Sequence, residues 1–237
     1  MKNFVRKVPL VGAIAQALHS KLMDHVLTFP GSAIYWEKRY RSGGNSGAGS
    51  YALLAQFKAD VINRYVSEHG VRSVIDFGCG DGNQLLLAKY PLYVGYDISR
   101  TAISRCRHLF QHDASKTFRL MSEYKGGRAD LVLSLDVLYH LVEQDTFEDY
   151  MRLVFGASSD HVIIYSTDFE DTRGHDGMHV RHREFTQWIR DELPEWGLVK
   201  SLPNRYAYRW YSPKGSRSEF FIYRLRDKHP KVEPSRF

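Results

Sequence analysis

The 237-residue sequence predicts an α/β protein with a largely parallel sheet and helices on both faces. From residue 73 to residue 168, short apolar segments alternate with segments of helical periodicity. Strands that read as continuous apolar runs are typical of parallel sheets covered on both sides. Two further apolar segments near the C-terminus lie close in sequence with no long helix between them, which predicts an antiparallel pair that completes the sheet.

The individual elements follow from local signals. The predicted strands are residues 73–77, 92–97, 117–121, 129–137, 160–168, 197–202 and 218–225. The predicted helices are residues 50–70, 83–90, 99–110, 144–155 and 182–193. Ser50 and Ser99 are expected to cap their helices, because a serine hydroxyl accepts a free backbone N–H at that position. Gly70 and Pro194 are expected to end the first and the last helix.

The N-terminal section is separated from the rest by a Gly- and Ser-rich stretch at residues 41–50, which predicts a mobile loop. Before this stretch, apolar residues recur every four positions, at Leu10, Ile14, Leu18, Leu22 and Val26. This spacing predicts an amphipathic helix that packs on the main domain or, given its basic flanks, contacts a membrane surface. The expected organisation is an extension over residues 1–49, a main domain over 50–225 and a basic tail over 226–237.

Composition excludes several classes of protein. With 43% hydrophobic residues the chain can bury a full core, and no segment approaches the about 20 apolar residues that a membrane span needs. The formal charge of +6 is scattered along the chain, so a nucleic-acid partner is not favoured. Cys79 and Cys106 form no disulfide framework, which fits a reducing, cytoplasmic compartment. The sequence does not indicate an oligomeric state.

The segment "VIDFGCGDGNQL" at residues 74–85 places a glycine-rich turn after the first strand. Such a turn lets the backbone approach a ligand closely. A nicotinamide-binding turn has the spacing G-x-G-x-x-G and would need glycine where this chain has Asn83. Here the spacing is G-x-G-x-G, and Asp76 stands two residues before Gly78. A carboxylate at that point disfavours a pyrophosphate and suits a cationic ligand.

Asp97 ends the second predicted strand, nineteen residues after Gly78. A carboxylate in this position can accept hydrogen bonds from both hydroxyls of a ribose. The sequence therefore predicts a nucleoside-containing ligand.

Together, "VIDFGCGDGNQL", "YVGYDIS" and "ADLVLSLDVLYHL" resemble the three signature segments of class I S-adenosylmethionine-dependent methyltransferases. The resemblance covers about residues 50–225. It implies a Rossmann-like fold with a seven-stranded sheet of order 3-2-1-4-5-7-6, in which strand seven is antiparallel. It also implies S-adenosylmethionine as cofactor, with the end of the fourth strand beside the reacting methyl group.

Carried over residue by residue, the resemblance implies a set of cofactor-binding positions. They are Asp76, Gly78, Gly80, Gly82, Asn83, Asp97, Ile98 and Leu135. For the adenine, either Glu123 or a neighbouring main-chain amide is expected to serve.

A narrower resemblance links "YWEKRYRSGGNSGAGSYALLAQFKA", "SLDVLYHLVE" and "HVRHREFTQW" to bacterial methyltransferases associated with glycan and surface-polysaccharide assembly. It implies O-methylation of a sugar, a glycan intermediate or a related small molecule. It also implies that Trp36 and Tyr40 fold over the cofactor, with the Gly/Ser stretch as a hinge or lid. The alternative is ordinary packing, because residues four apart share a helix face.

Catalytic candidates are expected just beyond the fourth strand, at Asp136, Tyr139 and His140. His140 is the preferred general base, because imidazole titrates near neutral pH. The alternative is that His140 packs or forms hydrogen bonds around the cofactor.

Substrate-binding candidates are Asp168 after the fifth strand, with His179, Arg181 and Arg183. Guanidinium groups bind phosphate or carboxylate in pairs, so a phosphorylated sugar would suit them. The alternative is a solvated basic loop. The histidines have no cysteine or carboxylate at a recognised ligand spacing, so no metal site is expected. Cys79 is interpreted as a small residue that the turn requires.

Three other functions remain as alternatives. An RNA methyltransferase is compatible with the basic charge, although no RNA-binding module is recognisable. An inactive cofactor-binding scaffold is compatible with intact nucleotide-site residues. A nicotinamide oxidoreductase is disfavoured by the glycine spacing.

Overall fold

The computed structural model describes residues 29–170, 177–209 and 215–226. The predicted N-terminal amphipathic helix and nearly all of the basic tail lie outside these residues. The chain divides after Pro30, and Gly31–Phe237 forms one compact unit. The Gly/Ser stretch at residues 41–50 therefore belongs to the same unit as the sheet.

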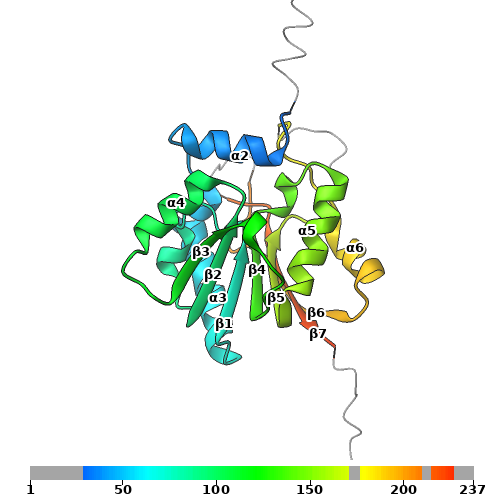
Figure 1. The fold of residues 1–237 in the computed structure, drawn as a ribbon. Coiled ribbons are helices and arrows are strands. Elements are labelled where there is room, and N and C mark those ends of the chain that lie inside the picture. The colour runs from blue at the N-terminus through cyan, green and yellow to red at the C-terminus, as the bar shows by residue number, and fades with distance from the viewer. Residues whose placement is uncertain (1–28, 171–176, 210–214, 227–237) are drawn as a thin grey trace, which may run out of the picture. The chain divides into compact units, whose positions relative to one another are not determined.

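A seven-stranded sheet forms the centre of this unit (Figure 1). Its strands are β1 Ser73–Phe77, β2 Leu92–Asp97, β3 Lys116–Leu120, β4 Ala129–Leu135, β5 Ser158–Ser166, β6 Trp196–Leu202 and β7 Glu219–Leu225. Their order is β3-β2-β1-β4-β5-β7-β6, with β1 to β5 parallel and β7 antiparallel to both of its neighbours. The predicted fold class, the strand order and the antiparallel closing pair are confirmed.

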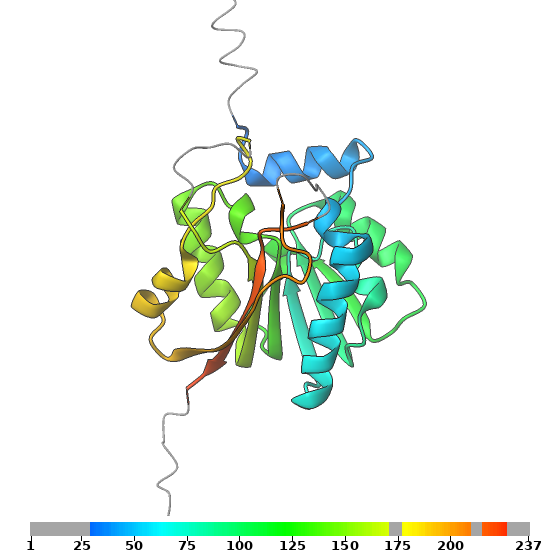
Figure 2. The same cartoon turned by 180° about the vertical axis from the view of Figure 1, so that it is seen from behind.

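Among the described residues, four helices cover the two faces of the sheet, and a fifth crosses the carboxyl ends of the parallel strands. The helices are α2 Ser32–Arg41, α3 Ala52–Glu68, α4 Arg100–Leu109, α5 Gln144–Gly156 and α6 Phe185–Glu192. The buried residues of α5 and α6 pack on one face, and those of α3 and α4 pack on the other (Figures 1 and 2). α2 crosses the edge where the parallel strands end.

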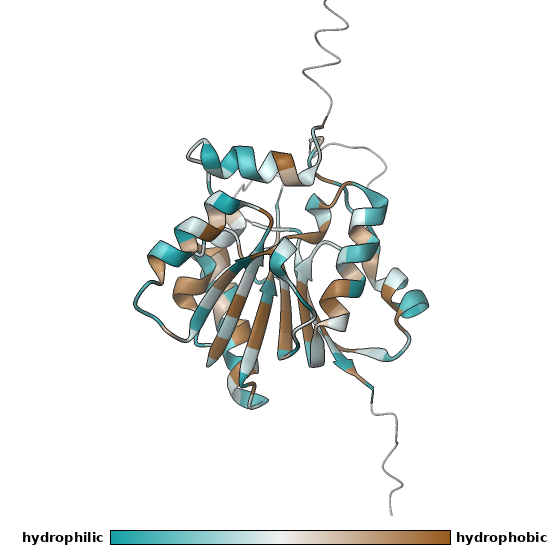
Figure 3. Cartoon of the chain, in the orientation of Figure 1, coloured by the Kyte–Doolittle hydropathy of each residue, from teal (hydrophilic) through white to brown (hydrophobic). Residues whose placement is uncertain are grey.

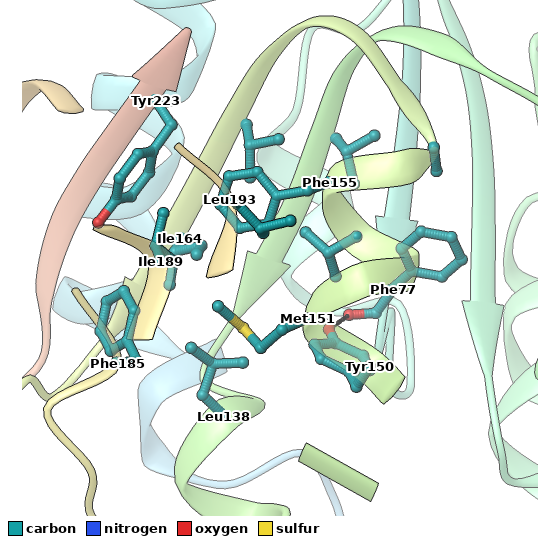
Figure 4. Packing of buried hydrophobic residues seen from close by; sticks show 14 of the residues in the cluster. Phe77, Leu138, Tyr150, Met151, Phe155, Ile164, Phe185, Ile189, Leu193 and Tyr223 are labelled. Atoms are coloured by element: carbon teal, nitrogen blue, oxygen red, sulfur yellow. Dashed lines mark hydrogen bonds between the residues drawn. The ribbon is translucent and has the colours of Figure 1, made fainter. Parts of the chain in front are cut away.

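The central strands β1, β4, β5 and β7 are mostly apolar and are buried on both faces (Figure 3). On the α5 side, Met151 and Phe155 pack with Ile189 of α6 and Tyr223 of β7 (Figure 4). The Tyr150 hydroxyl donates a 2.8 Å hydrogen bond to the carbonyl oxygen of the last residue of β1, so α5 is fixed next to the glycine turn.

Several predicted boundaries change for local reasons. The predicted helix 83–90 is only a 3₁₀ turn, Gln84–Leu87, because Ala88 is extended and Tyr90 precedes a proline, which disfavours helical backbone. Ser50 is not a cap, since it closes a short 3₁₀ turn and Tyr51 stands at the N-cap of α3.

Other local predictions are confirmed. Ser99 caps α4 by accepting the Ala102 N–H, and Gly70, at φ +60°, follows the end of α3.

The strand predicted at 160–168 starts and ends two residues earlier, and the helix predicted at 182–193 is shorter. In the part of the chain that the structure describes, no helix has the length and apolar character needed to cross a membrane.

Candidate functional site

Three glycines shape the loop after β1. Gly78, Gly80 and Gly82 have φ values of +89°, +59° and +81°, a region that favours glycine. A Cβ atom on Gly78 would lie 2.4 Å from Val137, and one on Gly80 would lie 2.3 Å from the Ser46 hydroxyl. Both the backbone conformation and the close approach of neighbouring segments therefore require glycine in this turn.

Asp76 is buried at the start of this turn with one carboxylate oxygen unsatisfied. Tyr93 donates its hydroxyl to Oδ2 at 2.9 Å. Among the described residues, nothing donates a hydrogen bond to the buried Oδ1. Burial raises the pKa of Asp76 to about 7, although the Tyr93 hydroxyl and the Lys58 charge act in the opposite direction. A buried carboxylate of this kind gains from a cationic or hydrogen-bond-donating ligand.

Asp97 is buried at the end of β2 and faces the same turn. The Gly80 N–H donates to Oδ2 at 2.9 Å and the Ser99 N–H donates to Oδ1 at 2.8 Å. Each oxygen retains capacity for a second hydrogen bond. Burial raises the pKa of Asp97 to about 6, although these N–H donors lower it. The carboxylate is thus fixed in orientation and can accept two further donors.

A cavity of about 420 Å³ lies at the carboxyl ends of the parallel strands. The predicted site residues that line it are Trp36, Tyr40, Asp76, Gly78, Gly80, Asp97, Ile98, Leu135, Asp136 and His140. Its walls also include Met121 after β3 and Tyr150 of α5. The structure therefore brings together most of the residues that were chosen from separate motifs.

The helix α2 covers this cavity and is fastened on two sides. Ser32 donates its hydroxyl to the carbonyl oxygen of His140 at 2.6 Å and also hydrogen bonds to Glu143. Toward the other end, Glu37 accepts hydrogen bonds from the side chains of Ser99 and Thr101, both at 2.7 Å. These hydroxyl donors lower the pKa of Glu37, despite the opposing effect of burial.

The Gly/Ser stretch docks on the glycine turn rather than lying free. The Ser46 N–H donates to the Asp81 carboxylate at 2.9 Å, and the Asp81 N–H donates back to the Ser46 hydroxyl at 3.0 Å. Tyr51 adds a 2.8 Å hydrogen bond to the same carboxylate. Glycine composition alone predicts mobility, but the Asp81 carboxylate supplies the partners that hold this segment.

Asp136 follows β4 in an uncommon backbone conformation. Its φ is +60°, which costs free energy for a residue with a Cβ and occurs frequently at functional sites. Its N–H donates to the carbonyl oxygen of Tyr165 at 2.8 Å, and its Oδ1 accepts the Tyr139 hydroxyl at 2.8 Å. The Asp136 carboxylate is therefore held at the wall of the cavity.

Lys58 is the site residue that the sequence analysis missed. This lysine of α3 is fully buried, lines the cavity, and places Nζ 2.6 Å from Oδ2 of Asp136. A signal for it existed, because Lys58 lies four residues after Leu54 and four before Ile62, on the buried stripe of the helix. A lysine on such a stripe requires an anionic partner.

His140 lies among other rings at the end of β4. It packs against Trp36, Tyr139 and His179, with ring centroids 4.8, 4.5 and 5.6 Å away. Its Nδ1 lies 3.1 Å from the carbonyl oxygen of His179, which can only accept, so the neutral ring carries its proton on Nδ1. Burial lowers the pKa of His140 to about 4. The expectation that this imidazole titrates near neutral pH does not hold.

Some predicted cofactor residues lie outside the cavity lining. Asn83 donates its amide to the carbonyl oxygen of Ser50 at 2.6 Å. Glu123 accepts the Leu120 N–H at 2.6 Å and lies half-exposed near Arg107. Gly82 lies against α4, where a Cβ would lie 3.0 Å from the Cys106 sulfur. These residues shape the surrounding loops, and Met121 takes the cavity position after β3.

The predicted substrate residues do not form one cluster in the cavity. Asp168 accepts the N–H and the hydroxyl of Thr186, at 3.0 and 2.6 Å, and so fixes the start of α6. Arg183 is buried and donates to the carbonyl oxygens of Leu141 and Val142, at 2.6 and 2.9 Å. Its guanidinium is committed to the backbone, so the structure does not support Arg183 as a phosphate ligand.

The other two substrate candidates lie nearer to the covering helix. The His179 ring stacks on Tyr35 of α2 with centroids 4.6 Å apart, and burial lowers the pKa of His179. Arg181 is exposed and donates through one nitrogen to the carbonyl oxygen of Val142 at 3.2 Å.

Cys79 and Cys106 are buried free thiols. A hydrogen bond with Cys106, together with burial, raises the pKa of the Cys79 thiol, which makes a nucleophilic role unfavourable. Within residues 29–170, 177–209 and 215–226, no three His, Cys, Asp or Glu side chains group as metal ligands.

Comparison with family models gives one match. Residues 51–211 match the model described as "Methyltransferase domain". No curated protein sequence matches the chain.

Many solved structures share the fold. The N-methyltransferase NodS from Bradyrhizobium japonicum WM9, in complex with S-adenosylhomocysteine, is 14% identical with a TM-score of 0.62, over 83% of this chain and 100% of NodS. The methyltransferase domain of bacterial CtHen1 is 19% identical with a TM-score of 0.56, over 73% and 98% of the two chains. Magnesium protoporphyrin IX methyltransferase from Synechocystis PCC 6803 is 18% identical with a TM-score of 0.54, over 72% and 83%. At these identities the likeness is one of fold.

Proposed function

The chain belongs to the methyltransferase domain family, and we propose that it methylates a hydroxyl oxygen of a sugar, a glycan intermediate or a related small molecule with S-adenosylmethionine. The observation that carries this proposal is the pair of buried carboxylates, Asp76 and Asp97, which face one glycine turn with unused hydrogen-bonding capacity.

The residues of the cavity fit this cofactor. The unsatisfied Oδ1 of Asp76 would accept the cofactor's ammonium group, and Asp97 would accept both ribose hydroxyls. Ile98 and Met121 would flank the adenine, so apolar contact replaces the expected contact with Glu123. Trp36 and Tyr40 of α2 would cover the bound molecule and exclude water.

When bound, S-adenosylmethionine supplies a methyl group on a positively charged sulfur. The protein's part is to align an acceptor oxygen and to remove its proton. A hydroxyl oxygen that is bonding to a methyl group becomes strongly acidic, so a carboxylate suffices as proton acceptor. Asp136, which follows β4 and lines the cavity, would take this role.

Asp136 suits the role better than His140. Protonation of His140 would create a cation in a crowded site, where His179 and Arg39 oppose it electrostatically. Protonation of Asp136 removes a charge instead. His140 is then a packing and positioning residue. Its carbonyl oxygen also accepts the hydrogen bond from Ser32 that holds α2 in place. Tyr139 orients Asp136 through its hydroxyl.

The acceptor class is supported by the shape and chemistry of the cavity. Its volume of about 420 Å³ is near the lower end of the range for small-molecule sites, so the acceptor is small or inserts one end. Ser46, Ser50 and Gln84 line it together with Trp36. Hydroxyl and amide groups beside an aromatic ring suit a sugar. Arg181, whose N–H donates to the carbonyl oxygen of Tyr139, would bind a phosphate on such a substrate.

Calorimetric titration tests the cofactor. The wild type, Asp97→Ala and the surface control Asp60→Ala are each titrated with S-adenosylmethionine, S-adenosylhomocysteine and NAD. We expect both adenosyl compounds to bind the wild type and the control, and to bind Asp97→Ala at least about 10-fold more weakly. Binding of NAD alone would contradict the proposal.

Transfer of a radiolabelled methyl group tests the acceptor. The substrates are a panel of nucleotide-activated hexoses and, in parallel, total bacterial RNA. Label in a hexose supports the proposal. Label only in RNA, or in neither, would refute the acceptor class while leaving the cofactor result intact.

A further inference from the structure

Lys58 occupies an unusual place for a lysine. It is 0% exposed, on the buried stripe of α3, yet its ammonium reaches the wall of the cavity. Burial of a lysine ammonium is unfavourable unless the charge is paired. Its retention in the core therefore calls for an explanation beyond packing.

The partners of Lys58 point to one carboxylate. Nζ lies 2.6 Å from Oδ2 of Asp136, and it also lies 5.1 Å from the centroid of the Tyr165 ring. Tyr165 accepts the amide of Asn204 at 2.6 Å, so the ring below the ammonium is itself fixed. The lysine thus has a well-defined position next to Asp136.

Asp136 is constrained from every direction. Its Oδ1 accepts the Tyr139 hydroxyl at 2.8 Å and lies 3.4 Å from the Ser218 hydroxyl. On the Oδ2 side, Gly49 approaches so closely that a Cβ there would lie 2.7 Å away. Lys58 contributes the single positive charge directly bonded to this carboxylate among the described residues.

We propose that Lys58 is the positioning residue of the acceptor site, where its ammonium holds the Asp136 carboxylate in the orientation that faces the acceptor hydroxyl. This inference rests on the methyl-transfer function proposed above. Without the ammonium, Oδ2 of Asp136 would lose its bonded partner and the carboxylate would turn toward another donor.

The proton step is simple. The O–H bond of the acceptor breaks, its electron pair stays on the acceptor oxygen, and the proton moves to a carboxylate oxygen of Asp136. Asp136 becomes neutral while Lys58 keeps its charge. The proton returns to water after the product leaves, which restores the ion pair with Lys58.

A double-mutant cycle tests the inference. The variants are Lys58→Met, Asp136→Asn and the double variant, with Lys200→Met on the exposed face of β6 as control. Turnover is measured with S-adenosylmethionine and the best hexose acceptor of the panel. We expect each single variant to lower kcat by about 100-fold and the double variant to be no worse than Asp136→Asn alone. Lys58→Arg, which keeps the charge, should recover part of the activity.

A binding measurement separates this role from a cofactor contact. Calorimetry at pH 8.5 compares S-adenosylhomocysteine with 5′-methylthioadenosine, which lacks the amino-acid end. We expect Lys58→Met to weaken S-adenosylhomocysteine by less than about fivefold. A loss of affinity as large as the loss of kcat, seen for S-adenosylhomocysteine and not for 5′-methylthioadenosine, would make Lys58 a cofactor ligand and overturn the inference.

The remaining outcomes are also decisive. Additive effects in the cycle would show that Lys58 does not act through Asp136. Lys58→Met leaves the Asp136 charge buried and unpaired, so this variant can fail to fold. The double variant leaves no such charge. Equal turnover of the double variant and Asp136→Asn would then still show that Lys58 acts through Asp136. A wild type that binds S-adenosylhomocysteine but methylates no hexose would refute the proposed acceptor class, and this inference with it.

Discussion

The carboxylate of Glu37 accepts a 2.7 Å hydrogen bond from the hydroxyl of Ser99, which lies 62 positions further along the chain. The Ser99 N–H in turn donates to Asp97, so α2 is tied to the turn that carries a buried carboxylate of the cavity. At its other end, Ser32 bonds to the carbonyl oxygen of His140. The covering helix is therefore fastened on both sides of the cavity.

Loss of the Glu37 fastening should speed ligand release. We expect Glu37→Ala to raise the dissociation rate of S-adenosylhomocysteine by about 5- to 10-fold, because charge-assisted hydrogen bonds from Ser99 and Thr101 are removed. Stopped-flow displacement measures the rate. Glu68→Ala at the exposed end of α3 is the control and should leave the dissociation rate unchanged. Equal rates in the two variants would show that the hydrogen bonds of Glu37 do not hold α2 over the ligand.

The docked Gly/Ser segment should resist protease when the cavity is filled. Trypsin can cut after Arg41, where α2 ends and the segment leading to Ser46 begins. Because Ser46 is held by Asp81 next to the glycine turn, a ligand in that turn should hold the segment more firmly. We expect saturating S-adenosylhomocysteine to slow cleavage there several-fold, as measured by mass spectrometry of timed digests. Unchanged cleavage would contradict this coupling.

Asp76 should lower the stability of the ligand-free protein at neutral pH. Its pKa of about 7 lies above the ordinary value of 3.8, so the folded state binds the proton more tightly than the unfolded chain. The stability that this protonation contributes is complete below about pH 4 and is lost as the pH rises through about 7. Asp76→Asn lacks this loss, and we expect it to be about 4 kcal/mol more stable than wild type at pH 8.

Urea unfolding at pH 5 and pH 8 measures this effect. The difference between Asp76→Asn and wild type should grow in favour of the variant as the pH rises. A difference of the opposite sign, or one that is independent of pH, would show that Asp76 is well stabilised as an ion without ligand. The variant should also fail to bind S-adenosylhomocysteine.

Ligand affinity should depend on pH for the same reason. Asp97 and Asp76, with pKa values of about 6 and about 7, must be ionised to accept ribose hydroxyls and an ammonium group. We therefore expect calorimetric affinity for S-adenosylhomocysteine to rise from pH 5.5 to pH 8 and then level off. An affinity that falls over this range would contradict the assignment of these carboxylates.

The two arginines before α6 should behave differently. Arg183→Lys loses hydrogen bonds to the Leu141 and Val142 carbonyl oxygens, so we expect a loss of about 2 kcal/mol in the free energy of unfolding. Arg181→Ala removes an exposed side chain and should change stability by less than about 0.5 kcal/mol. Urea unfolding compares them. A phosphorylated acceptor should show an increased KM with Arg181→Ala, and an unchanged KM would exclude this contact.

The fold was predictable because its signals are local and repeated. Apolar strand runs, the glycine turn and the Ser99 cap are each encoded by neighbouring residues. The failures concern side chains whose role depends on a distant partner. Arg183 was predicted to bind substrate, but its guanidinium donates to backbone carbonyl oxygens of the loop after β4 instead.

Two further cases show the same limit. His140 has an ordinary sequence context, and only the rings packed around it lower its pKa. Lys58 was visible as a charge on an apolar stripe, but nothing in the helix indicates that its partner lies 78 positions away. Tertiary pairing of this kind is not encoded in spacing.

Different parts of the chain form the two ends of the cavity. Asp76, Asp97 and the glycine turn come from residues 76–97, whereas Asp136 is contacted by Lys58 of α3, Tyr139 and Ser218, the residue before β7. Substitutions of lining residues outside the nucleoside end are expected to change which molecule is accepted. A directed-evolution library for new acceptors would therefore begin at Ser50 and Gln84, which line the cavity.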